Sequence, residues 1–418
     1  MASAQANGRR VAVTGMGVIS PIGNNVAQFW QNLLSGVTGI RPIECFDASD
    51  YPAHVAGVVD GFEATDYIDR QLARRTDRFA QLAVGAAVDA VRDAGLRLDD
   101  SDSESVGISL GTAVAGMAVV ERETSVLAEL GPRRISPMLI PSVIGNMAGC
   151  LISIVLKVHG PALCPTGACA TGCMAVGDAF QMIRSGIMDV MIAGGSDSMI
   201  TPLSVASFGR LGALSRRADD PALACRPFDV DRDGTVLSEG AAVLILESEA
   251  HARGRGANIL AEVAGYGITS DAYHIAAPDP NGTGASRSMQ GALRSAGLSP
   301  DAVDYIVAHG TGTPLNDISE SKAIRAVLGG RADTVPVSSN KHAVGHSLGA
   351  AGAVSAITAV QAIRNSIAPG TLNLRLKDPE CMVNAISSNV PGDIATVLVN
   401  AFGFGGQNAS LVLRRWVD

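Results

Sequence analysis

Aromatic and charged residues are scarce in this chain of 418 residues. Phenylalanine, tryptophan and tyrosine make up 4% of it and charged residues 17%, while 47% of the residues are hydrophobic. The core must therefore be built mainly from alanine and small aliphatic side chains. The 47 glycines indicate many tight turns and close contacts between helices and sheet. The length favours a duplicated or two-part core over one ordinary domain.

An excess of basic residues is also missing. The net charge of −8 at pH 7 argues against nucleic acid as a bulk electrostatic partner. The 7 cysteines are an odd number without the spacing of a disulfide framework, so we interpret them as reduced thiols of a cytosolic protein. The first residues, MASAQANGRR, contain no apolar segment typical of a secretion signal.

One uncharged run, residues 135–156, is long enough to span a bilayer. Prolines 137 and 141 and glycines 145 and 149 interrupt it. We therefore expect no membrane insertion. We interpret the run as a buried loop and helix, for example at a subunit interface.

Strand and helix patterns alternate along the chain in two successive blocks. In the first block we expect strands at 10–19, 106–110, 189–193 and 241–247, and helices at 25–35 and 77–95. A polar connection is expected at 251–256. In the second block we expect strands at 259–267, 303–308, 335–338, 396–402 and 409–413, and helices at 285–297, 316–328 and 347–364. The repetition predicts two fused α/β/α halves that share a central helix layer.

A candidate nucleophile, Cys169, lies in the stretch 163–186, LCPTGACATGCMAVGDAFQMIRSG. A sharp turn on Pro165 and Gly167 delivers the cysteine, and a helical pattern follows it. We expect Cys169 between a buried strand and a helix N-terminus. Unpaired N–H groups and the helix dipole at that point would shift its thiol towards thiolate.

Two histidines lie in glycine-rich turns after apolar segments. His309 follows an apolar strand in AHGTGT, at the strand end where ligands of open α/β sheets bind. Lys341 and His346 lie in NKHAVGHSLGAAG, before an Ala/Gly-rich helix. A lone histidine is more often structural, but two in such turns beside a candidate nucleophile favour catalysis.

Two patterns resemble metal sites without completing them. Asp229, Asp231, Asp233 and Gly234 match a calcium loop, but its twelfth position is a glycine, and Glu239 comes one residue early. We predict a structural turn there. Cysteines 164, 169 and 173 do not have zinc-ligand spacing, so 164 and 173 are predicted to be packing residues.

Four motifs in order carry a family resemblance. TGACATG at Cys169, HGTGT at His309, KHAVGHSLGAAG at 341–352 and NAFGFGGQN at 400–408 resemble the β-ketoacyl-[acyl-carrier-protein] synthases. Among these they resemble the type II elongating enzymes with a Cys-His-His site, over essentially the whole chain. The resemblance implies a thiolase-like fold of five layers, α-β-α-β-α. It places the nucleophile in a half at 1–255 and both histidines in a half at 256–418.

The implied reaction joins an acyl thioester to malonyl-carrier protein and releases carbon dioxide. Cys169 would carry the acyl chain, and His309 and His346 would bind the malonyl thioester carbonyl and stabilise the enolate. Lys341 would orient the site by pairing with Glu320. Asp317 stands where the family keeps a structural acid.

The resemblance also assigns binding roles. The N–H groups of Cys169 and Phe404 would hold the acyl carbonyl, and the Phe404 ring would gate the malonyl entrance. Thr311 and Thr313 would bind the pantetheine arm. No metal or redox cofactor is implied, since the thioester is already activated.

Chain length and partner depend on less specific positions. Val114 stands where a larger aliphatic often lines the acyl pocket, which would make the pocket slightly roomier. A basic rim for the acidic acyl carrier protein would comprise Arg74, Arg75, Arg133, Arg134 and Arg217. A homodimer is implied, with a heterodimer with a ketosynthase-like partner as the alternative. Fatty-acid and polyketide pathways both stay open.

Three rival interpretations are weaker. A non-catalytic chain-length subunit would lack the nucleophile. A thiolase would use a second cysteine in a glycine-rich turn of the C-terminal half, and Cys381 is not in one. An initiating synthase of the Cys-His-Asn type would carry asparagine at the place of His346.

Overall fold

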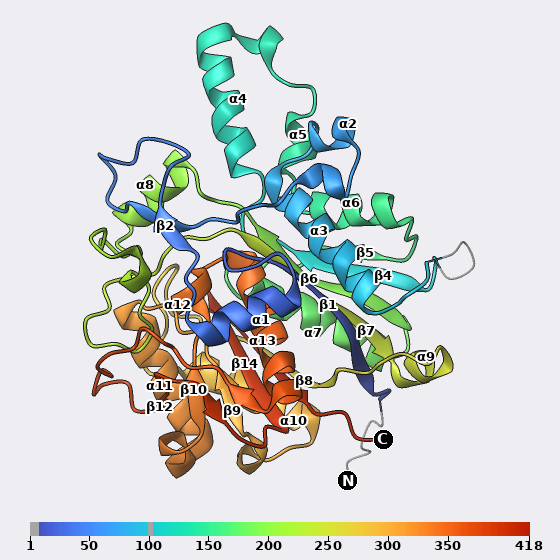
Figure 1. The fold of residues 1–418 in the computed structure, drawn as a ribbon, viewed down its shortest axis with the longest axis vertical. Coiled ribbons are helices and arrows are strands. Elements are labelled where there is room, and N and C mark those ends of the chain that lie inside the picture. Colours follow the sequence, from blue (N-terminus) through green and yellow to red (C-terminus); the bar gives the residue numbers. More distant parts are fainter. Residues whose placement is uncertain (1–7, 99–102) are drawn as a thin grey trace.

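A mixed sheet of eleven strands runs through the computed structural model, which describes residues 8–98 and 103–418 (Figure 1). The strand order is β12-β10-β9-β14-β15-β8-β1-β7-β6-β4-β5. In chain order these strands are β1 (Val11–Ile19), β4 (Val106–Gly111), β5 (Ala162–Leu163), β6 (Val190–Asp197), β7 (Gly240–Ser248), β8 (Ala261–Ser270), β9 (Tyr305–Val307), β10 (Pro336–Ser338), β12 (Asn384–Ala385), β14 (Thr396–Gly403) and β15 (Gln407–Arg414). Two small sheets pair β2 (Ile40–Pro42) with β3 (Val55–Gly57), and β11 (Ile367–Ala368) with β13 (Val390–Pro391).

The helices form three layers, one between the two halves of this sheet and one on the outer face of each half. They are α1 (Val26–Ser35), α2 (Arg70–Ala73), α3 (Arg78–Asp93), α4 (Met117–Leu130), α5 (Leu139–Val143), α6 (Met147–Leu156), α7 (Thr171–Arg184), α8 (Pro202–Arg210), α9 (Glu249–Gly254), α10 (Thr283–Ala296), α11 (Pro314–Leu328), α12 (Lys341–Val344) and α13 (Ala351–Asn365). Short 3-10 turns include η2 (Pro132–Arg134) and η6 (Leu348–Ala350).

Alternation along the strands produces the layers. In β7, Leu244 and Leu246 belong to the central apolar cluster with α7 and α13, while Val243 and Ile245 pack with α3 and α6. The same division occurs in β14, whose other face packs with α10 and α11. The prediction of five layers, α-β-α-β-α, is confirmed. The two halves of the sheet join where β1 pairs with β8.

The central helices α7 and α13 lie very close together. A Cβ added to Gly172 would lie 2.7 Å from the Ala353 nitrogen, and one added to Gly352 would lie 2.5 Å from the Cys173 nitrogen. Only hydrogen fits at these points. The glycines therefore let the start of α7, just after Cys169, approach the start of α13, just after His346.

Two sequence-based expectations about local structure are wrong. The connection expected at 251–256 lies largely within helix α9, which begins because the Ser248 hydroxyl accepts the N–H of His251. The strand before Cys169 is not buried: β5 has two residues, both exposed, at the edge of the sheet. An edge strand has a neighbour on one side only, here β4, so it gains less burial than the central strands.

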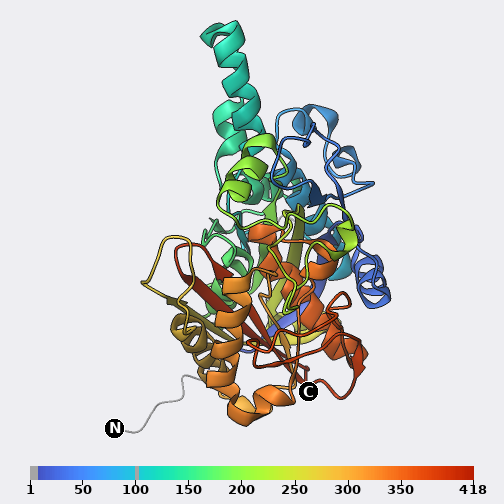
Figure 2. The same cartoon turned by 90° about the vertical axis from the view of Figure 1, so that its left-hand side faces the viewer.

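Helix α4 was not predicted and projects from the body of the molecule (Figures 1 and 2). Only two of its residues, Val119 and Glu123, are buried. The helix therefore has no extensive buried apolar face that its sequence pattern could have indicated. The uncharged run 135–156 contains α5 and α6, and it is only partly buried: Leu151 is inside while Ile154 is 63% exposed. Among the helices formed by the described residues, none is both long and apolar enough to cross a membrane.

Candidate active site

Cys169 lies in a constrained turn just before α7. The preceding residue, Ala168, has a φ of +49°, which is unusual for a residue with a side chain. The Thr171 hydroxyl donates to the Ala168 carbonyl at 2.6 Å and accepts the N–H of Gly167 at 2.9 Å. Gly403 packs so closely on this turn that an added Cβ would lie 2.4 Å from the Gly167 oxygen. The turn is therefore held by its own bonds and by the β14 strand end.

Burial keeps the Cys169 sulfur a thiol. The side chain is 7% exposed, and desolvation raises the pKa of its thiol to about 12. The charge of Lys341 and the N–H groups of Phe404 and Cys169 lower that pKa, while Asp197 raises it further. The shift towards thiolate that the helix N-terminus predicted is wrong for this state, because desolvation outweighs the helix effect.

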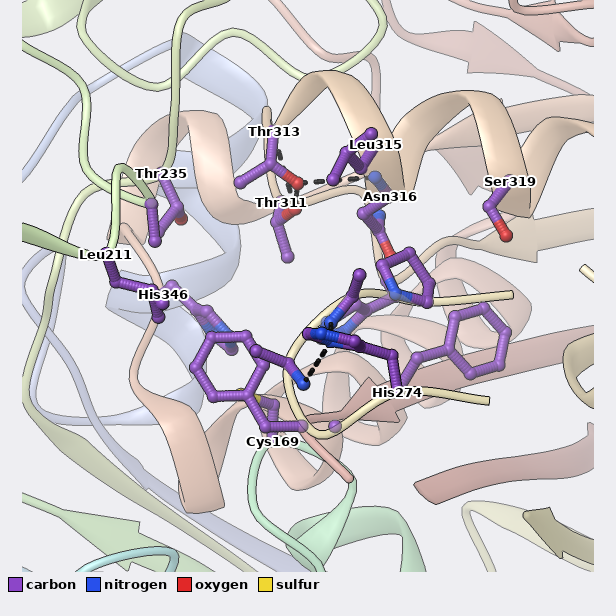
Figure 3. Close-up of a pocket in the computed structure, with 18 of the residues that line it drawn as sticks. Cys169, Leu211, Thr235, His274, Thr311, Thr313, Leu315, Asn316, Ser319 and His346 are labelled. Carbon is purple, nitrogen blue, oxygen red and sulfur yellow. Dashed lines mark hydrogen bonds between the residues drawn. The ribbon is translucent and has the colours of Figure 1, made fainter. Parts of the chain in front are cut away.

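His309 and His346 share one cavity of about 470 Å³ with Cys169 (Figure 3). Their ring centroids are 5.3 Å apart, and the planes of the two rings are nearly perpendicular, at 81°. His309 follows β9, and His346 follows α12. The backbone N–H of His346 donates to the Val236 oxygen at 2.7 Å, so this histidine is tied to the half of the chain that carries the cysteine. The structure thus brings together the three residues that the motifs separated.

Both imidazoles are held neutral. Burial, followed by the charge of Lys341, lowers the pKa of each well below its ordinary value. Among the described residues, nothing hydrogen-bonds to Nδ1 of His309 or to either ring nitrogen of His346. Buried polar atoms are normally paired, so these nitrogens indicate a place for a ligand. A neutral imidazole has one N–H to donate to a developing oxyanion.

Two buried charged groups hold the backbone around His309. Lys341 Nζ donates to the His309 carbonyl at 2.6 Å. Glu320 accepts the N–H groups of His309 and Gly310, each at 2.8 Å. Burial raises the pKa of Glu320 to about 7 and lowers that of Lys341.

The predicted pairing of Lys341 with Glu320 is wrong as a direct contact. Of the ion pairs among residues 8–98 and 103–418, none joins these two side chains. Instead, Lys341 binds the carbonyl of His309 and Glu320 binds its N–H group. Both side chains therefore fix the position of this histidine. The spacing of eleven residues between His309 and Glu320 could not distinguish the two arrangements.

Asp317 has the surroundings of a structural acid. It is fully buried, accepts the N–H of Phe228 at 2.9 Å and lies 3.5 Å from Nε of Arg232. The calcium-like stretch forms a turn, in which the Asp229 carboxylate accepts the N–H groups of Arg375 at 2.8 Å and of Leu376 at 3.0 Å. The Asp229 carboxylate therefore accepts backbone hydrogen bonds in this turn.

The predicted pantetheine and gate residues lie at the same cavity. Thr311 and Thr313 line it, with their hydroxyls 2.9 Å apart. Phe404 also lines it, is 38% exposed, and stacks on Phe208 at 6.1 Å and 23°. Phe208 was not predicted. In the sequence, Phe208 is one apolar residue of helix α8, and no motif distinguishes it.

His274 is a second unpredicted lining residue (Figure 3). Its Nδ1 accepts the N–H groups of Ala276 at 3.1 Å and Ala277 at 3.0 Å. The histidine thereby shapes the loop after β8 at the mouth of the cavity. No motif marked it, because the turn it forms depends on one side chain and two backbone groups.

None of the residues predicted for chain length and partner lines the cavity. Val114 is 36% exposed and does not line the cavity. Four of the five predicted arginines are exposed, and Arg217 is half-buried. Within the described part of the chain no ion pair involves Arg74, Arg75, Arg133, Arg134 or Arg217. These cations are therefore available to an acidic partner.

The fold and the facing cysteine and histidines define a thiolase-like condensing enzyme. Models of the beta-ketoacyl synthase N-terminal and C-terminal domains match residues 8–252 and 260–375. The chain therefore belongs to the β-ketoacyl synthase family.

Known proteins of this family cover nearly the whole chain. A 3-oxoacyl-[acyl-carrier-protein] synthase 2 of Synechocystis sp. is 46% identical over 98% of each protein. The ishigamide ketosynthase/chain length factor is 37% identical with a TM-score of 0.92, over 98% of this chain and 100% of that one. A ketosynthase solved with its type II PKS acyl-carrier protein and bound to the hexaketide is 34% identical with a TM-score of 0.91, with the same coverage.

Proposed function

We propose that this protein elongates acyl chains by decarboxylative condensation, using Cys169 as the acyl carrier and His309 and His346 as oxyanion donors. The product is a 3-oxoacyl thioester on the acyl carrier protein, in fatty-acid or type II polyketide synthesis. One observation carries the assignment of roles: the thiol and the two neutral imidazoles line a single cavity, although they come from different halves of the chain. The relatives named above support the reaction.

The first half-reaction loads the enzyme. The Cys169 sulfur attacks the acyl thioester carbonyl, the bond to the pantetheine sulfur breaks, and the thiol proton ends on the released carrier thiol. The N–H groups of Cys169 and Phe404 both lower the pKa of the Cys169 thiol, so they are directed towards the sulfur. They are therefore placed to hold the carbonyl oxygen as it becomes negative.

The second half-reaction extends the chain. The malonyl carboxylate leaves as carbon dioxide, and the resulting enolate oxygen accepts hydrogen bonds from His309 and His346. The enolate carbon attacks the acyl carbonyl, the bond to Cys169 breaks, and its sulfur takes up one proton. Thr311 and Thr313, at the cavity wall, would hold the pantetheine arm during both steps.

The partner and the assembly follow from the surface. The unpaired arginines at 74, 75, 133, 134 and 217 would receive an acidic acyl carrier protein. A homodimer is our proposal, because exposed apolar side chains gather in and near the uncharged run, including Ile140, Ile144 and Ile154. Val114 remains proposed as a residue beside the acyl chain, although it does not line the cavity described above.

Three further proposals concern the setting. The mechanism needs no metal or redox cofactor, because every step starts from an activated thioester. The cytoplasm is the proposed location, on the strength of seven free cysteines. We also propose a boundary between the halves at residue 255, in the segment between α9 and β8.

Mass spectrometry after incubation with acyl-carrier protein tests this function. The wild type should gain one acyl group on Cys169 and release 3-oxoacyl product after malonyl-carrier protein is added. Cys169→Gln should not be acylated but should still decarboxylate malonyl-carrier protein. An acyl group on another residue would overturn the assignment, and the absence of both acylation and product would favour a chain-length subunit.

A further inference from the structure

A buried carboxylate, Asp197, lies at the end of β6 and has no role in the mechanism above. It is 0% exposed. Its Oδ1 accepts the Thr112 hydroxyl at 2.6 Å and the Val114 N–H at 3.2 Å. Its Oδ2 accepts the N–H groups of Ala113 at 2.9 Å and Gly349 at 2.6 Å.

These four donors belong to two segments that are far apart in the sequence. Residues 112–114 form the turn after β4, in the half that carries Cys169. Gly349 lies in η6, three residues after His346 and at the start of the α13 region. An added Cβ at Gly349 would lie 2.5 Å from Asp197 Oδ2 and 2.6 Å from the Ala113 nitrogen, so the two segments meet directly on this carboxylate.

The carboxylate must be ionised to make all four bonds. An ionised carboxylate only accepts hydrogen bonds, and both of its oxygens here face two donors each. A proton on Oδ2 would point at an N–H group and break a tie, while a proton on Oδ1 could be accepted only by the Thr112 oxygen, which would reverse that bond. The charge also reaches the nucleophile, since Asp197 contributes to the raised pKa of the Cys169 and Cys164 thiols.

We infer that Asp197 is a positioning residue for the proposed condensation, because its carboxylate fixes the His346 segment against the turn beside Cys169. His346 is tied on its other side by backbone bonds to Val236 and Ser238. Asp197 is the side chain that joins this segment, through Gly349, to the turn at Ala113. This inference rests on the proposed function, since it assigns Asp197 to the step in which Cys169 and His346 act on one substrate.

Asp197→Asn is the main test. The amide nitrogen would replace either Oδ1, so that Thr112 and Val114 face a donor, or Oδ2, so that Ala113 and Gly349 do. A displacement of about 1 Å at a reacting centre can cost about 100-fold in rate, and we expect kcat for condensation to fall by about that factor. Decarboxylation by the Cys169→Gln background uses the two histidines but not the distance to the sulfur. His346 keeps its backbone bonds to Val236 and Ser238, and His309 keeps those to Lys341 and Glu320, so the added Asp197→Asn should lower decarboxylation by less than about threefold.

A matched variant separates positioning from folding. Thr112→Val removes one donor to the carboxylate and leaves the three N–H bonds. Burial raises the pKa of Asp197 to about 6, while the Thr112 bond lowers it. The acid limb of the kcat profile should therefore move to higher pH in Thr112→Val, and the share of it that Asp197 contributes should be lost in Asp197→Asn. Glu320, whose pKa burial raises to about 7, is present in all three proteins. Titration of Cys169 and Cys164 lies far above this range.

Several outcomes would overturn the inference. They are an unchanged condensation rate in Asp197→Asn, an equal loss in both reactions, or identical acid limbs in the wild type and Thr112→Val. A crystal structure of Asp197→Asn tests the geometry without any activity, because Gly349 should move away from Ala113. If the wild type itself fails to condense, the proposed function fails, and this structural comparison still decides whether Asp197 holds the two segments together.

Discussion

Cys169 is held by a turn of backbone, whereas His309 is held between two buried charged side chains. The cysteine side rests on an unusual φ at Ala168 and on the N–H groups of Cys169 and Phe404, which lower the pKa of the thiol. The histidine side uses Lys341 and Glu320, which bind the carbonyl and the N–H groups around His309. The nucleophile therefore depends on the orientation of the Cys169 side chain in apolar surroundings. The histidine donors depend on a fixed backbone position and a fixed protonation state.

Lys341 connects the two sides. Its charge lowers the pKa of His309 and of His346, and it also lowers that of the Cys169 thiol. One cation therefore adds to the effect of burial on the imidazoles and partly offsets the effect of burial on the sulfur.

Removing the sulfur should have the largest effect. Loss of a covalent nucleophile typically costs several orders of magnitude, so Cys169→Ala should lower the condensation rate by more than about 10⁴-fold. No acyl adduct should appear in the intact mass. Cys173→Ala is the matched control, since Cys173 is buried against α13, and it should keep the adduct. A rate above one-tenth of wild type in Cys169→Ala would show that another group carries the chain.

Removing one histidine donor should separate the two sides. His346→Ala and His309→Ala should each lower condensation by about 10²–10³-fold, the usual cost of one oxyanion donor. The first acyl transfer to Cys169 should stay within about threefold of wild type, because that step uses backbone N–H groups. Rapid-quench measurement of the acyl-enzyme burst checks the difference. Equal losses in both steps would mean that the division of labour is wrong.

Replacing the shared cation should act on both sides at once. In Lys341→Met the pKa of both histidines should rise, and the pKa of the Cys169 thiol should rise as well, since the lysine charge lowers all three. We expect a loss of about 10–100-fold in condensation, in the range typical of electrostatic preorganisation. Histidine NMR titration and the pH dependence of iodoacetamide alkylation measure the shifts. A change confined to one side would show that Lys341 does not connect them.

Glu320 should make stability depend on pH. Its folded pKa of about 7 lies above the ordinary value of 4.5, so the folded state binds more protons between these values. Its contribution is then most favourable at low pH and declines as pH rises towards 7, by at most about 1.4 kcal/mol per pH unit. Chemical denaturation from pH 5 to 8 should show this decline, and Glu320→Gln should flatten it. Asp197, with its pKa raised to about 6, contributes in the same direction and remains in that variant.

The gate should show the smallest effect. Phe208→Leu removes the ring on which Phe404 stacks, and such aromatic contacts are worth about 0.5–1.5 kcal/mol. We expect KM for malonyl-carrier protein to change by about 2- to 10-fold with kcat nearly constant. Phe46→Leu is a suitable control, because its aromatic partner is Tyr51. A larger loss in kcat than in KM would place Phe208 in the chemistry and not in substrate entry.

The sequence predicted most of the strands and long helices of the layered fold, because each depends on hydrophobic periodicity over a few residues. Strand β1 and helix α3 begin and end within a residue or two of their expected positions. The exceptions have weak local signals. Helix α4 buries only two residues, and α9 depends on a single cap at Ser248.

The motifs also located the main candidate residues of the site, since Cys169, His309, His346, Thr311, Thr313 and Phe404 all line one cavity. They did not locate Phe208, His274 or Asp197. His274 acts locally, on Ala276 and Ala277, in a turn that no motif marks. Phe208 and Asp197 act through contacts with segments that lie far away in the sequence, at Phe404 and at Gly349. No local spacing encodes such contacts.

The sequence by itself determined which elements form, and its motifs named the chemical groups that the site uses. Only the tertiary structure decided the state of those groups: the sulfur a thiol, the histidines neutral, and Lys341 bonded to a carbonyl instead of to Glu320. The reason is physical. Periodicity and turn preferences act within a few residues, whereas desolvation and charge depend on every segment that packs around a buried atom, and here those segments come from both halves of the chain.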